Sequence, residues 1–254
     1  MLLSIDIGNT NITLGIFKEK ELLETFRLAS DKDLSIEEYE FLLKTLCQNY
    51  SINECVIGAV VEELNDIIKL ACDNVFEIDS LLINPSSCKG LEINLKNPKE
   101  IGADRFANAY AAKTKYKLPA IVVDIGTATT FDIVSKDGKF LGGVIMPGLN
   151  LQFKSLNLNT SKLPRISASF SEKAIGDSTE NALLSGIMRG SACAIEGLIN
   201  QCELELGEKA TIIATGGQSS LISEYMFRSF DYIDSSLTLE GLRLLYELNL
   251  ATKS

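Results

Sequence analysis

Two short acidic turns contain the residues best suited to hold phosphate groups and a cation. Asp6-Ile7-Gly8-Asn9-Thr10 and Asp124-Ile125-Gly126-Thr127-Ala128 each end an apolar run of strand length. A carboxylate at the end of a buried strand is costly unless a cation or a metal-bound phosphate compensates it. The glycine allows close backbone approach, and the threonine hydroxyls and turn N–H groups can donate to phosphate oxygens. A single copy would be explained as an ordinary strand end, but two copies favour phosphate binding from both sides.

A third acidic residue, Asp104, lies between these turns in the sequence Gly102-Ala103-Asp104-Arg105. The preceding Asn97-Pro98-Lys99-Glu100 predicts a helix start, because asparagine caps helices and proline suits their first turn. Asp104 can accept a proton from a substrate hydroxyl, and Arg105 can orient a carboxylate or phosphoryl oxygen through paired hydrogen bonds. Taken alone, the motif is explained equally well by an aspartate favoured by the helix dipole and a surface arginine.

The residue types that are absent limit the chemistry. The chain contains no histidine, so a general base must be a carboxylate or another less usual group. The six cysteines show no CxxC spacing. We therefore expect reduced, buried thiols rather than a zinc site or a disulfide framework.

The charge and the hydropathy pattern predict the cellular compartment of the protein and the partners that it does not bind. The formal net charge is −10, which argues against binding to nucleic acid or to anionic lipid. The amino terminus lacks the basic start and long apolar core of a signal peptide. No stretch was expected to reach the roughly 18 apolar residues of a membrane helix. The sequence therefore predicts a soluble, cytoplasmic protein without nucleic-acid or membrane partners.

The first half of the chain alternates strands and helices. A meander of three strands is predicted, followed by an amphipathic helix, a buried strand, a second helix and an alanine-rich helix. These elements are expected at Leu2 to Asp6, Asn11 to Phe17, Leu22 to Leu28, Ser35 to Tyr50, Cys55 to Val61, Glu63 to Ala71 and Ala103 to Lys115.

The pattern then restarts, because Asp124 follows Asp6 by 118 residues, about one domain. Three strands are again predicted, with a tight hairpin at Asp137-Gly138, followed by a long helix, a strand and a closing helix. The expected positions are Ala120 to Asp124, Thr129 to Val134, Phe140 to Ile145, Gly176 to Glu205, Thr211 to Thr215 and Leu239 to Leu248. We predict two duplicated α/β domains, residues 1–116 and 117–254, that pack directly across a cleft.

The phosphate-binding chemistry is not that of a P-loop, because no GxxxxGK[ST] sequence occurs. Duplicated hairpins that open with Asp-x-Gly resemble the actin-like ATPase superfamily. By that resemblance, the fold is two ribonuclease H-like α/β domains with a nucleotide in the central cleft.

The motifs together resemble those of type III pantothenate kinases over essentially the whole chain. The Gly-x-Asp-Arg motif between two Asp-Ile-Gly turns is the most specific part. The matching segments are Asp6 to Thr10, Gly102 to Arg105, Asp124 to Ala128, Gly142 to Gly148, Gly176 to Thr179, Ser185-Gly186, Thr215 to Gly217 and Leu237 to Gly241.

The resemblance implies an ATP-dependent phosphorylation of pantothenate to 4′-phosphopantothenate, the first step of coenzyme A biosynthesis. By the resemblance, Asp104 would be the general base that takes the proton from the pantothenate hydroxyl. Asp124 would coordinate a monovalent cation, K⁺ or NH₄⁺, and Thr127 would contact ATP, which Mg²⁺ would accompany. Thr179 would reach pantothenate from the partner subunit of a homodimer.

The resemblance also assigns two groups of binding residues. The first phosphate-binding hairpin would consist of Asp6, Ile7, Gly8, Asn9, Thr10, Asn11, Ile12 and Thr13. The pantothenate pocket would be lined by Leu95, Gly102, Ala103, Asp104, Arg105 and Thr179. The sequence departs from the family pattern at Leu95, where many relatives carry tyrosine, at Asp177, and at Gly58 to Glu62, which lacks the usual proline.

Two other functions remain open at this stage. A group related to these kinases includes a transcriptional accessory factor, so the fold could serve regulation. Asp6, Asp104, Arg105 and Asp124 are all present, which favours a catalyst, and the acidic charge argues against direct DNA binding. A kinase of the same superfamily that acts on acetate or a sugar is the other alternative, and the short chain and the Gly-Ala-Asp-Arg motif count against it.

Overall fold

A computed structural model describes residues 1–158 and 166–253 of the 254-residue chain. The chain forms two compact units. One consists of Met1–Glu92, Lys96–Thr114 and Ser236–Ser254, and the other of Ile93–Leu95 and Lys115–Ser235. The predicted division into residues 1–116 and 117–254 differs from these units at residues 93–95, 115–116 and 236–254, and as a domain boundary it stays a prediction.

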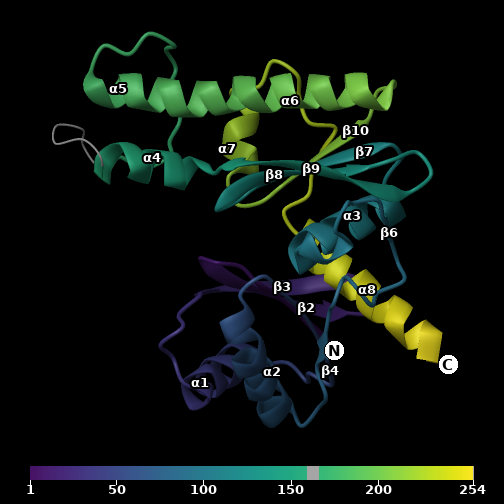
Figure 1. Cartoon of the computed structure of the whole chain (residues 1–254). Coiled ribbons are helices and arrows are strands. Elements are labelled where there is room, and N and C mark those ends of the chain that lie inside the picture. The colour runs from purple at the N-terminus through teal and green to yellow at the C-terminus, as the bar shows by residue number, and fades with distance from the viewer. Residues whose placement is uncertain (159–165, 254) are drawn as a thin grey trace. The chain divides into compact units, whose positions relative to one another are not determined.

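The first unit contains a five-stranded mixed sheet (Figure 1). Its strands run in the order β3-β2-β1-β4-β5, with β1 antiparallel to β2 and parallel to β4. The helices are α1, α2, α3 and α8, with a short 3₁₀ turn at Pro98–Glu100. The bounds are β1 Leu2–Ile7, β2 Asn11–Lys18, β3 Glu21–Ala29, α1 Ile36–Cys47, β4 Glu54–Ala59, α2 Glu62–Phe76, β5 Leu81–Leu82, α3 Ala103–Lys115 and α8 Leu237–Lys253.

Helices cover both faces of this sheet. The α1 and α2 helices share a hydrophobic core with β1, β2 and β4, and a capping box between Ser35 and Glu38 starts α1. On the other face α8 contacts β1 and β4, where Ser4 Oγ donates a hydrogen bond to the carbonyl oxygen of Leu239 at 3.1 Å. A Cβ atom at Gly241 would lie 2.1 Å from the carbonyl oxygen of Ala107, so α8 also packs backbone to backbone against α3.

The second unit repeats this architecture. Its sheet runs β11-β10-β7-β8-β9-β6, and the run β9-β8-β7-β10-β11 has the same order and strand directions as β3-β2-β1-β4-β5. The predicted duplication of an α/β domain is therefore confirmed. The bounds are β6 Glu92–Ile93, β7 Ala120–Ile125, β8 Ala128–Val134, β9 Lys139–Pro147, α4 Leu149–Leu158, α5 Thr179–Leu184, a π-helical turn Ser185–Arg189, α6 Gly190–Leu206, β10 Thr211–Thr215, α7 Ser219–Ser223 and β11 Tyr232–Ile233.

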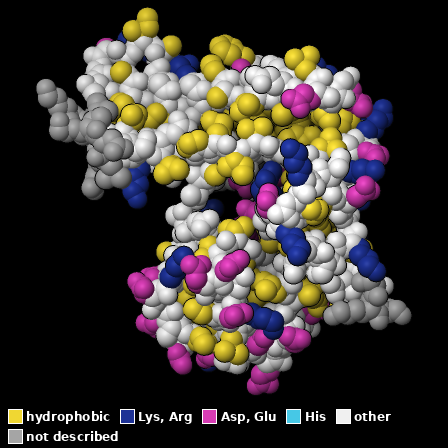
Figure 2. All heavy atoms as spheres, viewed as in Figure 1, with side chains coloured by type: hydrophobic (Ala, Val, Ile, Leu, Met, Phe, Trp, Pro, Cys, Tyr) yellow, Lys and Arg dark blue, Asp and Glu magenta, His cyan; other side chains and the backbone are white. Residues whose placement is uncertain are grey.

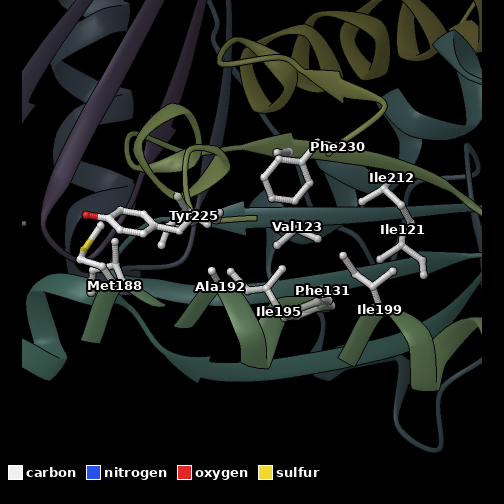
Figure 3. Packing of buried hydrophobic residues seen from close by; sticks show 14 of the residues in the cluster. Ile121, Val123, Phe131, Met188, Ala192, Ile195, Ile199, Ile212, Tyr225 and Phe230 are labelled. Atoms are coloured by element: carbon white, nitrogen blue, oxygen red, sulfur yellow. The ribbon is translucent and has the colours of Figure 1, made fainter. Parts of the chain in front are cut away.

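The continuous helix formed by α5, the π-helical turn and α6 covers one face of the second sheet. Ala192, Ile195 and Ile199 pack against a cluster that includes Val123 of β7 and Phe131 of β8 (Figure 3). This burial explains why the predicted long helix forms, since the apolar residues of α6 face the sheet.

One expectation about membranes was wrong. The helix Thr179–Leu206 is long and apolar enough to span a membrane, judged by length and composition alone. Many of its apolar residues belong to the core of the second unit, with Met188, Ala192 and Ile199 almost completely buried, although Leu204 is exposed. Core packing explains its hydropathy, and the sequence shows no continuous apolar run here because Ser185, Arg189 and Glu196 interrupt it.

The six cysteines are all free thiols, and Cys47, Cys55 and Cys72 are buried in the core of the first unit. Burial raises the pKa of the Cys47 thiol to about 11, which keeps it protonated and unreactive at neutral pH.

Candidate active site

The first acidic turn joins β1 to β2 at the carboxyl end of β1. Asp6 pairs with Thr13 across the two strands and is half-buried, while Asn9 and Thr10 are exposed. The N–H of Gly8 donates to the carbonyl oxygen of Asn11 at 3.0 Å and closes the turn. The exposed turn can therefore offer N–H groups and the Thr10 hydroxyl to an anion, next to the Asp6 carboxylate.

Sequence reasoning did not identify Ser30, which fixes this turn. Its Oγ donates to the carbonyl oxygen of Gly8 at 2.5 Å, and its N–H donates to the carbonyl oxygen of Thr10 at 3.0 Å. Ser30 comes directly after β3, the third strand of the meander, so it returns to the turn only when the hairpins are formed. In the sequence, Ser30 is only a serine at the end of a predicted strand. Its contacts with the turn form only in the folded sheet.

Asp104 lies in the first turn of α3 and is partly buried. The backbone N–H of Arg105 donates to Asp104 Oδ1 at 2.7 Å. Burial raises the pKa of the Asp104 carboxyl above its ordinary value, and the hydrogen bond and the positive charge of Arg105 oppose this effect. A carboxylate with a raised pKa is a better proton acceptor than an ordinary aspartate, provided it is still ionised at the working pH.

Gly102 makes room for this carboxylate. A Cβ atom there would lie 2.5 Å from Asp104 Oδ1 and 3.1 Å from a methyl group of Val60. Gly102 precedes α3 rather than interrupting it. The absence of a side chain at Gly102 therefore leaves room for the Asp104 carboxylate and for Val60.

The first turn and Asp104 lie at the same edge of the first sheet. The N–H of Val60, which follows β4, donates to the carbonyl oxygen of Ile7 at the end of β1, at 3.1 Å. Val60 also contacts Gly102. Ligands of open α/β sheets bind beyond the carboxyl ends of the strands, and the structure brings the predicted phosphate turn and the predicted base to that place.

The second acidic turn joins β7 to β8 in a closely similar way. Asp124 pairs with Thr130, as Asp6 pairs with Thr13, and is half-buried. The N–H of Gly126 donates to the carbonyl oxygen of Ala128 at 3.0 Å, and Thr127 is exposed at the tip. In both turns the glycine N–H closes the loop, but the second turn is one residue shorter, because Gly8 bonds to Asn11 whereas Gly126 bonds to Ala128.

Two glycines from other strand ends enclose the second turn. A Cβ atom at Gly148, after β9, would lie 2.3 Å from the carbonyl oxygen of Gly126. A Cβ atom at Gly216, after β10, would lie 2.4 Å from Asp124 Oδ1. Both glycines stood in motifs of the sequence without an assigned role, and the structure shows that they provide the space for the turn and its carboxylate.

Asp124 presents a single carboxylate at the second acidic turn. Within residues 1–158 and 166–253, no group of three or more histidine, cysteine or acidic side chains could hold a metal ion. A single carboxylate with neighbouring backbone and hydroxyl oxygens suits a monovalent ion. Mg²⁺ usually binds one or two carboxylates together with substrate phosphates.

The remaining predicted substrate residues, Leu95 and Thr179, belong to the second unit. Leu95 lies beside β9, where a Cβ atom at Gly142 would lie 3.4 Å from its Cδ2. Thr179 is exposed as the first residue of α5, directly after the N-cap Ser178. Ala103 and Arg105 accompany Asp104 at the start of α3 in the first unit.

Comparison with known proteins places this geometry in a family. A family model described as type III pantothenate kinase matches residues 2–201. A type III pantothenate kinase of Moorella thermoacetica is 41% identical over 254 residues, covering 98% of this chain and 100% of that protein. Among solved structures, a protein from Campylobacter jejuni named as a Baf family transcriptional activator aligns with a TM-score of 0.65 and 22% identity, covering 98% and 99% of the two chains. The activator of 2-hydroxyisocaproyl-CoA dehydratase from Clostridium difficile, with bound ADPNP, aligns with a TM-score of 0.58 and 14% identity, covering 99% and 97%. The two structural matches are informative about the fold alone.

Proposed function

The chain belongs to the type III pantothenate kinase family, and we propose that it transfers the γ-phosphoryl group of ATP to the hydroxyl of pantothenate. The products are ADP and 4′-phosphopantothenate, and the reaction opens coenzyme A biosynthesis in the cytoplasm. The observation that supports this most directly is the partly buried Asp104 carboxylate, with its raised pKa, at the sheet edge that also carries the Asp6 turn.

In the proposed reaction Asp104 acts as the general base. It accepts the proton of the pantothenate hydroxyl while the hydroxyl oxygen attacks the γ-phosphorus. The bond between that phosphorus and the bridging oxygen breaks, and ADP leaves with the electron pair. Phosphoryl transfer demands little covalent chemistry from the protein, so a correctly placed base and neutralised phosphate charge account for the mechanism without a histidine.

The two acidic turns are proposed to hold the triphosphate. Their N–H groups and exposed threonine hydroxyls supply donors, and Ser30 keeps the first turn in shape. The residues assigned to this role are Asp6, Ile7, Gly8, Asn9, Thr10, Asn11, Ile12, Thr13 and Thr127.

Two cations accompany the proposed reaction. Asp124 would hold the monovalent cation, K⁺ or NH₄⁺, through its carboxylate. Mg²⁺ would bind with ATP and neutralise its phosphate charge.

Pantothenate is proposed to contact Leu95, Gly102 to Arg105 and Thr179, with Thr179 supplied by the partner subunit of a homodimer. Several large apolar side chains are exposed on the second unit, and a contiguous patch of such side chains would mark an interaction surface. Ile145, Leu151, Phe170 and Ile175 are 65%, 49%, 55% and 87% exposed. On the face shown in Figure 2, hydrophobic side chains gather over this unit, whereas acidic side chains are spread over the first unit.

One assay tests the proposal. Purified protein with Mg-ATP should phosphorylate pantothenate, and K⁺ should increase the rate. Asp104→Asn should remove the activity, while Asp33→Asn, which changes an exposed aspartate of the first unit, should not. If the protein turns over no pantothenate with any monovalent cation, the catalytic proposal fails and the regulatory alternative is favoured.

A further inference from the structure

A π-helical turn interrupts the long helix of the second unit. Ser185–Arg189 lies between α5 and α6, and such turns are rare and occur frequently at functional sites. Ser185 and Arg189 are four residues apart, so they project from the same side of the helix. Both side chains donate hydrogen bonds to residues 171–174. These residues belong to a stretch without helix or strand, residues 166–178, that leads to Thr179.

Arg189 binds two consecutive carbonyl groups of this stretch. Its Nη2 donates to the carbonyl oxygen of Ser171 at 2.9 Å and to that of Glu172 at 2.7 Å. Its guanidinium lies over the ring of Tyr225, 5.1 Å from the ring centroid. Hydrogen bonds from a charged donor are stronger than neutral ones, and arginine stacks well on aromatic faces, so this side chain is fixed on two sides.

Tyr225, which follows α7 in the chain, binds the same stretch. Its hydroxyl donates to the carbonyl oxygen of Ser169 at 3.1 Å and accepts from the N–H of Ser171. Its ring packs 5.4 Å from the ring of Phe170 and is buried in the core cluster of the unit (Figure 3). The hydroxyl therefore ties both neighbours of Phe170 to a side chain that cannot move independently of the core.

The end of the stretch is fixed just as closely. Ser185 Oγ donates to the carbonyl oxygen of Ala174 at 2.5 Å. A Cβ atom at Gly176 would lie 2.2 Å from the backbone nitrogen of Ala182, so the chain here touches α5. Ser178 then caps α5 by accepting from the N–H of Asn181 at 3.1 Å, and Thr179 follows.

We propose that Arg189 and Tyr225 are positioning residues for pantothenate, because they bind residues 169–172 to the second unit and thereby restrain the segment that leads into Thr179. Surface loops usually leave their carbonyl groups to water, whereas here the carbonyls of residues 169, 171, 172 and 174 all accept from side chains of the second unit. The inference rests on the proposed function, since Thr179 is a pantothenate contact only by that proposal.

The two side chains should affect substrate binding rather than the chemical step. Asp104 and the Asp6 turn belong to the first unit, and neither Arg189 nor Tyr225 contacts the Asp124 turn in any described hydrogen bond or ring contact. Loosening the stretch should therefore raise KM for pantothenate and leave KM for ATP unchanged.

The test uses the whole protein in three variants and two controls. Arg189→Met removes the donors, Arg189→Lys keeps the charge but loses the planar group, and Tyr225→Phe keeps the ring but loses both hydroxyl bonds. Lys136→Met and Tyr232→Phe are matched controls, because they change an exposed cation and an exposed tyrosine of the same unit. We expect KM for pantothenate to rise about 10-fold in Arg189→Met and Tyr225→Phe, and less in Arg189→Lys. KM for ATP, kcat and the controls should stay within about 2-fold of wild type.

A second readout does not depend on activity. Lys173 lies within the stretch and its side chain is 74% exposed, so trypsin cleavage after it reports how firmly the stretch is held. Cleavage after Lys173, identified by fragment mass, should be faster in Arg189→Met and Tyr225→Phe than in wild type and controls.

Each combination of results either supports or overturns the positioning role of Arg189 and Tyr225. A rise in KM for pantothenate together with faster cleavage supports the inference. A rise in KM without faster cleavage, faster cleavage without a rise in KM, or an equal rise in KM for ATP would overturn it. If the wild-type protein fails to turn over pantothenate, the proposed function falls and the substrate role falls with it. Faster cleavage of the variants would then still show that the two side chains hold the stretch.

Discussion

Gly216 lies so close to Asp124 that no other residue type could replace it without moving the carboxylate. A Cβ atom at Gly216 would be 2.4 Å from Asp124 Oδ1 and 2.7 Å from the backbone nitrogen of Ile125. The φ angle of Gly216 is also positive, at +86°, a region that side chains disfavour. The carboxyl end of β10 is therefore shaped around the carboxylate that β7 presents.

Gly216→Ala tests this relationship. The substitution should destabilise the protein by about 1–3 kcal/mol, because it adds both a clash and backbone strain. It should also remove the increase in rate caused by K⁺, since the Asp124 carboxylate is displaced. Urea unfolding and kinase assays with and without K⁺ measure the two effects.

Gly197→Ala is the matched control, because a Cβ atom there meets nothing within 4 Å inside α6. Alanine is favoured over glycine in a helix by about 0.5–1 kcal/mol, so this variant should be more stable than wild type and keep its response to K⁺. Equal stability and equal K⁺ response in Gly216→Ala and wild type would show that the site tolerates a side chain.

Asp104→Asn should lower kcat by about 100-fold or more while stabilising the fold at neutral pH. The pKa of Asp104 is raised in the folded protein, mainly by burial. Its ionised form therefore costs stability as pH rises through the folded pKa, and asparagine avoids that cost. The Tm of the variant should exceed that of wild type at pH 7, and the difference should disappear in acid, where the wild-type carboxyl is protonated. A lower Tm at pH 7 would contradict this account.

The pH dependence of the wild-type rate gives a further check. The acid limb of kcat/KM should have its midpoint above about 3.9, the ordinary pKa of aspartate, because the base is active only when ionised. A midpoint at or below that value would show that a carboxyl group with a raised pKa does not control the acid limb.

Ser30→Ala should weaken ATP binding, because the carbonyl group of Gly8 loses the hydrogen bond that the Ser30 hydroxyl donates to it. Loss of one such hydrogen bond corresponds to a rise of about 3-fold to 10-fold in KM for ATP. Ser86→Ala, at an exposed position of the same unit, serves as the control. Steady-state kinetics with varied ATP measures the effect, and an unchanged KM would show that the turn keeps its shape without Ser30.

Glu203 should account for much of the acid sensitivity of the second unit. It is buried and accepts from both terminal nitrogens of Arg228 at 2.8 Å, from Lys209 at 2.7 Å and from the N–H of Ala210 at 3.1 Å. The hydrogen bonds from Arg228 are the main reason that its pKa is lowered to about 2. The carboxylate thus contributes stability above its unfolded pKa of about 4.3, and this contribution is lost as pH falls toward about 2.

Glu203→Gln should therefore cost about 2–3 kcal/mol at pH 7 and much less near pH 2. Glu208→Gln breaks only an exposed pair with Lys136 and should cost less than about 0.5 kcal/mol. Denaturant unfolding at several pH values distinguishes the two, and equal costs at pH 7 would show that burial of the Glu203 network adds nothing.

Elements that are determined by local pattern were predicted well. The strand expected at Leu2 to Asp6 is β1, Leu2–Ile7, and the long helix expected from Gly176 to Glu205 spans Thr179–Leu206. The second helix was predicted too short, since α2 continues to Phe76. Both acidic turns occupy strand ends as expected, because apolar runs followed by Asp-Ile-Gly leave the chain few alternatives.

Features that depend on contacts distant in sequence could not be predicted. Helix α7 and the short strands β5, β6 and β11 have too few residues for a periodic signal, and the longer helix α4 was also not predicted. The π-helical turn differs from an α-helical one only in hydrogen-bond register, which packing decides. The roles of Ser30, Gly148 and Gly216 exist only because strand ends far apart in the chain meet in the sheet.

The helix that completes the first unit is encoded after the whole of the second. Until α8 has been synthesised, the surface of β1 and β4 that it covers, around Ser4 and Gly58, has no partner on the nascent chain. Folding of the first unit therefore finishes after the second unit has emerged from the ribosome, and a chain stopped before residue 236 would carry an uncovered apolar sheet that invites chaperones and proteases.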